Sequence, residues 1–456
     1  MKKIRIGAAQ GFYGDTIEGA LYTAKYGDVD YLCFDCLAEL TMAILAKDKA
    51  KDDQSGYTKD LSNTMKALLP FVKEKGIKLL TNAGGVNPMA AKDEIIRVAK
   101  SLGISELKVA VITGDDVMPN LPQWQQQGIS LAHIDSGEVF NAEREYLFAN
   151  AYLGVWPIVE ALQQGADIVI TGRTTDSAQF LAPAAFEFGW KKDQWNQLAH
   201  GIVMGHLLEC SAQSTGGNYS GNWEEIDFNQ IGYPIAEIDE TGTFVVSKAD
   251  GSGGLVSFDT VREQLLYEIH DPANYITPDV VADLSHVQLE EVAKNEIRVS
   301  NVFGKPAPER LKVVMGYTNG YMIQTLIGYS WPHAFNKARR AAQIIEQQVR
   351  DKKIPVDELH FDYLGYNSLH GPLATPPDDS INEIYLRLVA RGNDKRMLNL
   401  IPRLVPPLAL NGPPSLGGLI NLAPRQLLGM WATLVDRTII EPQVEIHFET
   451  IAQEVS

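Results

Sequence analysis

The sequence predicts an α/β protein with an N-terminal parallel sheet and crossover helices, followed by a C-terminal α+β domain. Strand-like and helix-like segments alternate along residues 1–232, which is typical of a parallel sheet. Residues 233–309 instead pair short strands around turns, as a mixed connecting region with a hairpin would. Residues 310–456 combine further strands with one long amphipathic helix. We therefore expect three parts, of which the first carries the functional site.

The first part alternates strands and helices in a regular order. Short apolar runs predict strands at residues 3–9, 30–35, 77–81, 107–113 and 168–171. Apolar residues spaced three and four apart predict helices at residues 16–25, 40–52, 61–75, 91–101 and 158–164, with another after Asp176. Gly76 and Gly103 each follow a predicted helix, where glycine commonly ends the last turn. Right-handed crossovers then give a sheet that is either doubly wound or barrel-like, and residues 117–140 form a lid or an edge hairpin.

The remaining parts show other patterns. Residues 235–238 and 243–246 flank the turn sequence DETG, which predicts a hairpin, and residues 256–269 predict a strand and a helix. Residues 310–330 alternate on either side of YTNGY, which predicts a second hairpin. Beyond it we expect helices at 335–350 and 395–405 and strands at 359–364 and 381–389. This order resembles ferredoxin-like packing.

The composition excludes several classes of protein. The chain has 456 residues, of which 45% are hydrophobic, and a net charge of −17. This negative charge argues against general nucleic-acid binding and against docking on anionic membranes. The sequence shows no signal peptide and no run of the ~18–20 apolar residues that span a bilayer. Three cysteines make no disulfide framework, so the expected location is the cytoplasm.

The three cysteines have no clear chemical role in the sequence. Cys33 and Cys36 form a single CxxC pair within a predicted buried strand, so a packed strand is favoured over a redox pair. Cys210 could be a nucleophile influenced by His206, or the two side chains could pack on one helix face, four residues apart. The role of each cysteine stays open.

Polar and glycine-rich loops follow all five predicted parallel strands. Because the carboxyl ends of parallel strands share one edge of a sheet, these loops are expected to form one site. The residues singled out in these loops are Gly11, Asp35, Glu39, Asn82, Gly84, Gly85, Asp115, Arg173 and Asp176. Gly7, Gly11 and Gly14 do not have the GxGxxG spacing, but a nucleotide-binding loop remains an alternative.

The charged residues of this edge suggest acid–base chemistry or metal binding. Asp35 and Glu39 could act as general bases or, with Asp115, bind a hard divalent cation. Asp35 could equally be a structural anchor that accepts hydrogen bonds from loop amides. Arg173 could bind a substrate carboxylate with both ends of its guanidinium group, or it could pair with Asp176.

The segment LLECSAQSTGGNYSG, at residues 207–221, adds candidates from outside the five loops. Glu209 follows a predicted helix and is a candidate acid or base. The turn that follows could present backbone amides to an oxyanion or phosphate. Its candidate substrate-binding residues are Thr215, Gly216, Gly217 and Asn218.

Several of these segments together resemble one protein family. They are QGFYGD, DYLCFDCLAE, TNAGGVNP, TGRTTDSAQFLAPAAFEFGW, GHLLECSAQSTGGNY, GYPIAEID, GSGGLVSFDTVREQLLYEIHDPANYITPDVVAD and LNGPPSLGG. Over nearly the whole chain, in this order, they are similar to the acyclic terpene utilisation protein A family. One loop departs from the family pattern, because it reads GRTTD where the family is closer to GRVAD. Thr174 and Thr175 are therefore weaker candidates than Arg173 and Asp176.

The resemblance implies a catabolic role beside biotin-dependent acyl-CoA carboxylases, enoyl-CoA hydratases and acyl-CoA dehydrogenases. Some family members carry a C-terminal ferredoxin-like segment, and others have it as a separate small protein. The chain resembles the short form, so a small ferredoxin-like partner subunit is expected. We also expect a homo-oligomer and a small acid or acyl thioester as the substrate.

The resulting hypothesis is lyase or hydratase chemistry on a branched or carboxylated acyl thioester, such as a coenzyme A thioester, or on a small carboxylic acid. The residues assigned to catalysis are Asp35, Glu39, Arg173, Asp176 and Glu209. One alternative is a non-catalytic scaffold or regulatory subunit of an acyl-CoA carboxylase assembly. The other is a nucleotide-dependent enzyme that uses the first glycine loop.

Overall fold

The computed structural model describes residues 2–377 and 380–452, and the chain forms two compact units. Unit 1 comprises Met1–Ala142, Tyr146–Gly316 and Met430–Ser456, and unit 2 comprises Glu143–Glu145 and Tyr317–Gly429. This division differs from the expected parts 1–232, 233–309 and 310–456, because residues 233–309 lie within unit 1. The reason is strand pairing, since the strands after position 233 extend the N-terminal sheet.

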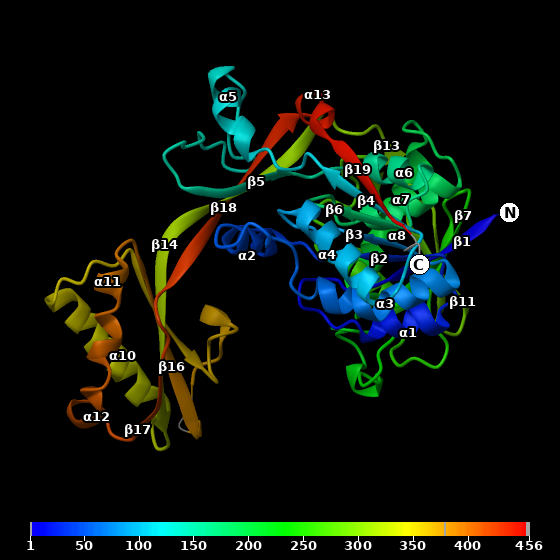
Figure 1. The fold of residues 1–456 in the computed structure, drawn as a ribbon. Coiled ribbons are helices and arrows are strands. Elements are labelled where there is room, and N and C mark those ends of the chain that lie inside the picture. The colour runs from blue at the N-terminus through cyan, green and yellow to red at the C-terminus, as the bar shows by residue number, and fades with distance from the viewer. Residues whose placement is uncertain (1, 378–379, 453–456) are drawn as a thin grey trace. The chain divides into compact units, whose positions relative to one another are not determined.

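Unit 1 is built on a ten-stranded mixed sheet in the order β11-β12-β8-β7-β1-β2-β3-β6-β4-β19 (Figure 1). Its five central strands are parallel: β1 (Lys3–Ala8), β2 (Tyr31–Phe34), β3 (Lys78–Thr81), β6 (Ile168–Thr171) and β4 (Leu107–Thr113). Every residue of β2 and β6 is buried, as strands covered on both faces require. The predicted mixed α/β class and its parallel strands are confirmed, while the choice between doubly wound and barrel-like stays a prediction.

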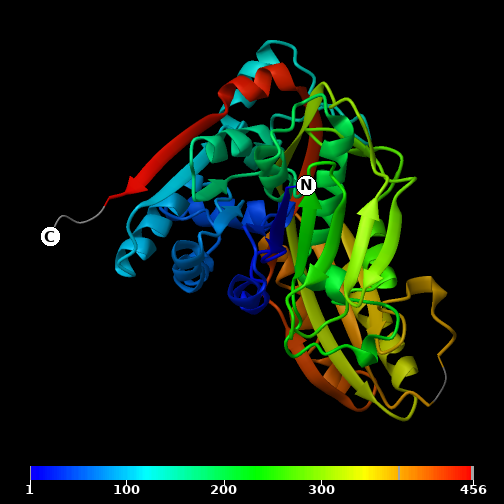
Figure 2. The ribbon, with the colours of Figure 1, turned by 90° about the vertical axis from the view of Figure 1, so that its right-hand side faces the viewer.

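Antiparallel strands extend this sheet on both sides. On the side of β1 lie β7 (Pro234–Asp239), β8 (Phe244–Lys248), β12 (Glu296–Ser300) and β11 (Gln288–Ala293). The predicted hairpin around DETG is thus the β7–β8 pair, and it joins the sheet beside β1. On the side of β4, the late strand β19 (Glu445–Ile451) pairs antiparallel along its full length (Figure 2).

The helices of unit 1 fall into two packed groups. One group contains α1 (Glu18–Tyr26), α3 (Leu61–Lys75) and α4 (Pro88–Ser101), and the other contains α6 (Trp156–Gln163), α7 (Ala178–Glu187) and α8 (Trp195–Leu208). Gly76 ends α3 in the left-handed conformation, as predicted. The remaining helices are α2 (Glu39–Lys49), α5 (Leu121–Gln126), α9 (Phe258–Leu266) and α13 (Arg437–Ile440). No strand lies within the described residues 117–140, so the predicted edge hairpin is wrong there.

Three short strands and one 3-10 turn complete the surroundings of the site. The strands are β5 (Tyr146–Ala151), β9 (Tyr275–Ile276) and β10 (Val281–Asp283), and the turn is Ser211–Thr215, after α8. Strand β10 pairs with β9 on one side and with a further strand, β13 (Phe303–Lys305), on the other. Strand β5 pairs with β14 (Arg310–Ser330), whose first seven residues belong to unit 1.

Unit 2 is an antiparallel sheet in the order β15-β16-β14-β17, with β15 (Glu358–Leu364), β16 (Glu383–Gly392) and β17 (Leu416–Asn421). Strand β18 (Arg425–Asp436) also pairs with β14. Helix α10 (Ala334–Asp351), predicted from its amphipathic spacing, packs its buried side chains into the unit's own core. The predicted helix at 395–405 is instead α11 (Lys395–Leu398) and a 3-10 turn, and α12 (Leu408–Asn411) follows.

The second predicted hairpin is wrong, because β14 continues for 21 residues through YTNGY. A two-residue hairpin of the type favoured by Asn-Gly needs positive φ at both turn residues. Gly320 has φ +75°, but Asn319 is outside the left-handed region. From Tyr321 onward the strand pairs with β16 instead of folding back on itself. Within the described residues, no helix is both long enough and apolar enough to cross a membrane.

A buried charged cluster as the candidate functional site

The carboxyl ends of the parallel strands bring four predicted residues together in two hydrogen-bonded pairs. Asp35 follows β2 and accepts a hydrogen bond from Asn82, which follows β3, over 2.6 Å between Oδ1 and Nδ2. Asp115 follows β4 and accepts one from the backbone amide of Arg173, which follows β6, over 2.7 Å. All four side chains are buried. The loops that the sequence placed on one edge therefore do meet there.

Arg173 lies at the centre of this cluster. Its Nη1 donates to the carbonyl oxygen of Leu37 over 2.7 Å and to Oδ1 of Asp176 over 2.8 Å. Its guanidinium carbon lies 4.1 Å from the centre of the Tyr152 ring, in a cation–π contact. Burial opposes the charge, but Asp176, Tyr152 and Asp35 outweigh it and raise the pKa of Arg173. The arginine is a permanent buried cation that is already paired with Asp176.

Asp115 acts as an anchor for the Arg173 loop. Its Oδ2 accepts hydrogen bonds from the Arg173 amide and, over 2.7 Å, from Nδ2 of Asn150. Burial raises its pKa to about 6, although these two hydrogen bonds oppose the shift. A side chain on Gly172 would overlap the Asp115 carboxylate, so glycine is required beside it.

Asp35 keeps one hydrogen bond to Asn82, whose Oδ1 accepts from the amide of Cys36 over 2.6 Å. Burial raises the pKa of Asp35 well above its usual range, and the nearby negative charge of Asp176 adds to the shift. Its carboxyl group can therefore hold a proton where an ordinary aspartate would be ionised. Such a group has the properties of a general acid or base.

Glu39, at the start of α2, belongs to a second side of the cluster. Tyr152 donates its hydroxyl to Oε1 of Glu39 over 2.5 Å, and Nζ of Lys312 lies 3.5 Å from the same oxygen. Burial favours the neutral acid, but Tyr152, Arg173 and Lys312 together lower the pKa of Glu39. The sequence offered no signal for Tyr152 or Lys312, because β5 and the start of β14 reach this edge only through tertiary pairing.

Glu209 pairs with His206, which was predicted only as a neighbour of Cys210. Oε1 of Glu209 lies 3.0 Å from Nδ1 of His206, and its Oε2 accepts from Oγ of Ser177 over 3.3 Å. Burial raises the pKa of Glu209. Burial lowers that of His206, but the hydrogen bond and charge of Glu209 outweigh it, so the pKa of His206 is raised. Both shifts favour a proton held by the pair.

His206 also carries a buried atom without a hydrogen-bond partner in the described structure, its Nε2. Leaving a buried polar atom unpaired costs about 1–3 kcal/mol. The spacing of three residues between His206 and Glu209 at a helix end was the sequence signal that could have revealed this pair.

A cavity of about 570 Å³ opens beside the cluster, entirely within unit 1. Tyr152, Asp176 and Lys312 of the charged cluster line it, together with Tyr275 of β9. Much of the remaining wall is apolar and comes from Ile134, Ile276, Pro278, Pro308, Leu311 and Leu434. Thr175, Thr277, Glu309 and Arg310 complete the lining. The cavity thus joins an apolar wall to a charged floor, as small-molecule sites commonly do.

The predicted glycine and turn residues have different surroundings. Gly11 lies against the backbone of Glu209–Ser211, where a Cβ atom would come 2.7 Å from a carbonyl oxygen. Gly84 and Gly85 lie in the loop before α4 and pack on Thr171 and Leu45. The Thr215 hydroxyl donates hydrogen bonds to the backbone carbonyl oxygens of Ala212 and Gly232.

Two backbone amides of the TGGN turn donate to residues just before the turn. Those of Gly216 and Gly217 donate to the carbonyls of Gln213 and Ala212, and the Asn218 side chain donates to that of Gln213. The two glycine amides are therefore not free for an oxyanion in this structure.

The described residues offer no ready set of ligands for a metal ion. Among the described residues, no group of three or more His, Cys, Asp or Glu side chains is placed to hold an ion, so Asp35, Glu39 and Asp115 do not form one. The thiols of Cys33 and Cys36 are free and buried, and burial raises the pKa of each well above its usual value. Burial likewise raises the pKa of Cys210.

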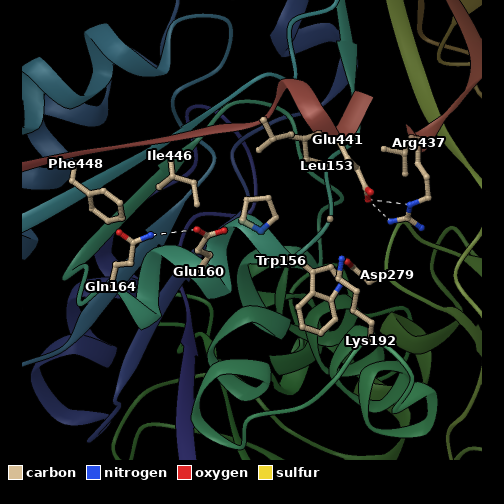
Figure 3. A pocket seen from close by; sticks show the side chains of 14 residues that line it. Leu153, Trp156, Glu160, Gln164, Lys192, Asp279, Arg437, Glu441, Ile446 and Phe448 are labelled. Carbon is tan, nitrogen blue, oxygen red and sulfur yellow. Dashed lines mark hydrogen bonds and ion pairs between the residues drawn. The ribbon is translucent and has the colours of Figure 1, made fainter. Parts of the chain in front are cut away.

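A second cavity, of about 450 Å³, lies between α6 and the C-terminal strand β19 (Figure 3). Trp156 and Lys192 line it, with the Lys192 ammonium 5.6 Å from the indole centre. Across it, Arg437 is bound to Glu441 over 2.6 Å. The described residues that line this cavity include none of the predicted site residues, so the charged cluster remains the candidate site.

Comparison with known proteins adds one finding. The model of the acyclic terpene utilisation family protein AtuA matches residues 4–446. Searches among curated proteins and among solved structures give no match for the chain.

Proposed function

Because the chain belongs to the acyclic terpene utilisation family of AtuA, we propose that it is a cytoplasmic catabolic enzyme of that process. In this proposal it performs lyase or hydratase chemistry on a branched or carboxylated acyl thioester or a small carboxylic acid. One observation carries the proposal. Buried groups with raised pKa values, Asp35 and Glu209, lie near Asp176, which pairs with a buried arginine and lines a partly apolar cavity.

The cavity supports the proposed substrate class. Its aliphatic wall fits the apolar part of a branched acyl group, since such surface gains free energy when it leaves water. The side chains of Lys312 and Arg310 add positive charge for a carboxylate or a thioester oxygen. Asp176 lines the same cavity and is held by Arg173, so it is placed to exchange a proton with the oxygen that leaves or attacks.

In this mechanism Arg173 orients groups and does not bind the substrate itself. Its Nη1 already donates to Leu37 and Asp176, one face of its guanidinium group packs on the Tyr152 ring, and the described residues that line the cavity do not include Arg173. A developing enolate oxygen would instead be stabilised by Lys312, and the proton would move through the carboxyl groups. A divalent cation, a homo-oligomer and a small ferredoxin-like partner stay predictions.

The experiment is a turnover assay of the purified protein on a panel of branched enoyl thioesters, hydroxyacyl thioesters and the corresponding acids. Hydration, dehydration or carbon–carbon cleavage is followed by mass spectrometry. Asp176→Asn keeps the shape of a side chain that is 38% exposed, so it should fold normally. We expect it to lose about 100-fold in kcat or more, as for a general acid or base.

Arg173→Ala should lose turnover as well, and the exposed Asp135→Asn serves as the control that keeps it. Wild-type turnover by Asp176→Asn and Arg173→Ala would defeat the assignment of these residues. No turnover by the wild-type protein on the whole panel, together with a stable complex with acyl-CoA carboxylase subunits, would support the scaffold alternative.

A further inference from the structure

Four neighbouring side chains lead from the cavity to a buried pair. Tyr275 lines the cavity, and although burial raises the pKa of Tyr275, the nearby Ser177 side chain lowers it. Ser177 Oγ lies 3.3 Å from Oε2 of Glu209, whose Oε1 lies 3.0 Å from Nδ1 of His206. The path joins three segments far apart in the chain: β9, the loop before α7, and the end of α8.

The inner end of this path is closed off from water. The side chains of His206 and Glu209 are 3% and 9% exposed, and Ser177 is fully buried. The Tyr275 ring packs on His206 with 5.7 Å between the ring centres. Nε2 of His206 has no partner in the described structure. An arrangement this costly in desolvation is not explained by stability alone.

Other titratable groups also face the pair. Asp176 and Asp35 act on it from the strand edge, and Glu268 and Cys210 from the segments that flank it. Asp176 and Glu268 favour an added proton on the pair, while the Arg173 guanidinium bound to Asp176 offsets part of that effect.

We propose that Tyr275, Ser177, Glu209 and His206 form a proton-transfer chain in which Tyr275 exchanges the proton with the substrate and the Glu209–His206 pair stores it. This inference rests on the proposed function, because it supplies the base of the same site. Glu209 is too deeply buried to touch the substrate. Tyr275 is the member of the chain that lines the cavity.

The proton balance of one forward step is simple. The substrate α-carbon loses a proton to Oη of Tyr275, while Tyr275 passes its own hydroxyl proton to Oγ of Ser177. Ser177 passes its hydroxyl proton to Oε2 of Glu209, and His206 stabilises the new carboxylic acid through Nδ1. The net result is one proton moved from substrate to Glu209. The reverse sequence returns it to the carbon or to a departing oxygen.

The first test measures proton removal without requiring the full reaction. The protein is incubated in D₂O with 3-methylbutanoyl-coenzyme A, and deuterium at the α-carbon is followed by mass spectrometry between pH 5 and 9. Tyr275→Phe and Ser177→Ala should each slow the exchange about 100-fold, while Ser177→Thr, which retains a hydroxyl, should restore most of it. Glu209→Gln should flatten the pH profile.

Two buried hydroxyls outside the chain provide matched controls. Tyr233→Phe removes a hydroxyl that donates to the carbonyl of Thr16, and Ser214→Ala removes one that donates to Leu207. Both variants should exchange at the wild-type rate. Wild-type exchange rates and pH profiles in Tyr275→Phe and Ser177→Ala would overturn the chain.

A second readout does not depend on activity, so it separates this inference from the proposed function. The imidazole of His206, assigned with His206→Asn, is titrated by NMR. Tyr275→Phe keeps the ring and removes only the hydroxyl, so a shift of at least about 0.5 pH unit in the His206 titration reports connection through Ser177. Tyr275→Phe should cause no further shift in a Ser177→Ala background.

The two failures are then distinct. Absence of exchange and turnover in the wild-type protein, with the His206 shift present, contradicts the proposed function and keeps the connected chain. An unshifted His206 titration in Tyr275→Phe contradicts the chain, whatever the turnover assay gives.

Discussion

At the scale of single residues, Asp115 shows how one carboxylate can order a whole loop. It accepts hydrogen bonds from the Arg173 amide and the Asn150 side chain, and its carboxylate has room only because residue 172 is glycine. The same hydrogen bonds leave it little freedom for chemistry. Asp115 therefore serves the site by placing Arg173, while Asp176 lines the cavity itself.

The pKa of Asp115 gives a stability prediction. Its folded pKa of about 6 lies above the usual aspartate pKa of 3.8, so the folded protein binds the proton more tightly than the unfolded chain does. The contribution of this group to the free energy of unfolding is thus most favourable below about pH 4 and falls as the pH rises through about 6. The full difference is on the order of 3 kcal/mol.

The measurement compares urea unfolding of the wild type and Asp115→Asn between pH 4 and 7. We expect the stability of the wild type, relative to that of the variant, to fall over this range. The exposed Asp135→Asn provides the baseline. Parallel curves for wild type and Asp115→Asn would contradict the raised pKa.

At the scale of elements, the end of α8 is held in place by a close backbone approach. Gly11, in the loop after β1, touches the backbone from Glu209 to Ser211. The contact joins the first strand's loop to the helix end that carries Glu209 and, one turn earlier, His206. A bare glycine backbone is what permits the two segments to meet.

Gly11→Ala tests this contact. The added Cβ atom would lie 2.7 Å from the Glu209 carbonyl oxygen and 2.8 Å from the Ser211 nitrogen, and neither atom is on a flexible side chain. We expect a loss of about 1–3 kcal/mol in the free energy of unfolding, together with a fall in turnover. Gly417→Ala, whose Cβ meets no atom within 4 Å, should change stability by less than about 0.5 kcal/mol. Equal stability of the two variants would show that the backbone around Gly11 moves aside for the added Cβ atom, and it would contradict the prediction.

At the scale of the whole molecule, the two units have separate cores. The core of unit 2 lies between α10 and its antiparallel sheet, and Ile345 is fully buried within it. Unit 1 buries its own mixed sheet with other helices. The candidate site belongs wholly to unit 1. Each core is therefore expected to respond to its own substitutions.

Ile345→Ala tests this independence. Loss of three buried carbons should destabilise unit 2 by about 2–5 kcal/mol. Hydrogen exchange followed by mass spectrometry should rise within Tyr317–Gly429 and stay unchanged in β1 to β4. Exchange that rises equally in both units would instead show one cooperative structure.

The local elements were largely predictable from the sequence. Residues 61–75 and 107–113 form α3 and β4 as expected, and Gly76 ends α3 in the left-handed conformation. Apolar spacing determines such elements because the burial of one face depends on neighbours within a few residues. The same reasoning placed Asp35, Asn82, Asp115 and Arg173 on one edge, since parallel strands share their carboxyl ends.

Contacts between distant segments needed the tertiary structure. The Asn-Gly pair at 319–320 suggested a hairpin, yet pairing with β16 keeps β14 extended. Tyr152 reaches the site from just after β5, and Lys312 and Tyr275 reach it from β14 and β9; no local pattern marks them.

By itself the sequence thus determined the α/β class and the polar edge, because local periodicity and strand direction suffice for both. Only the folded structure decided which charged groups lie together and which of them hold a proton, because a side chain's pKa and partners depend on burial and on atoms hundreds of residues away.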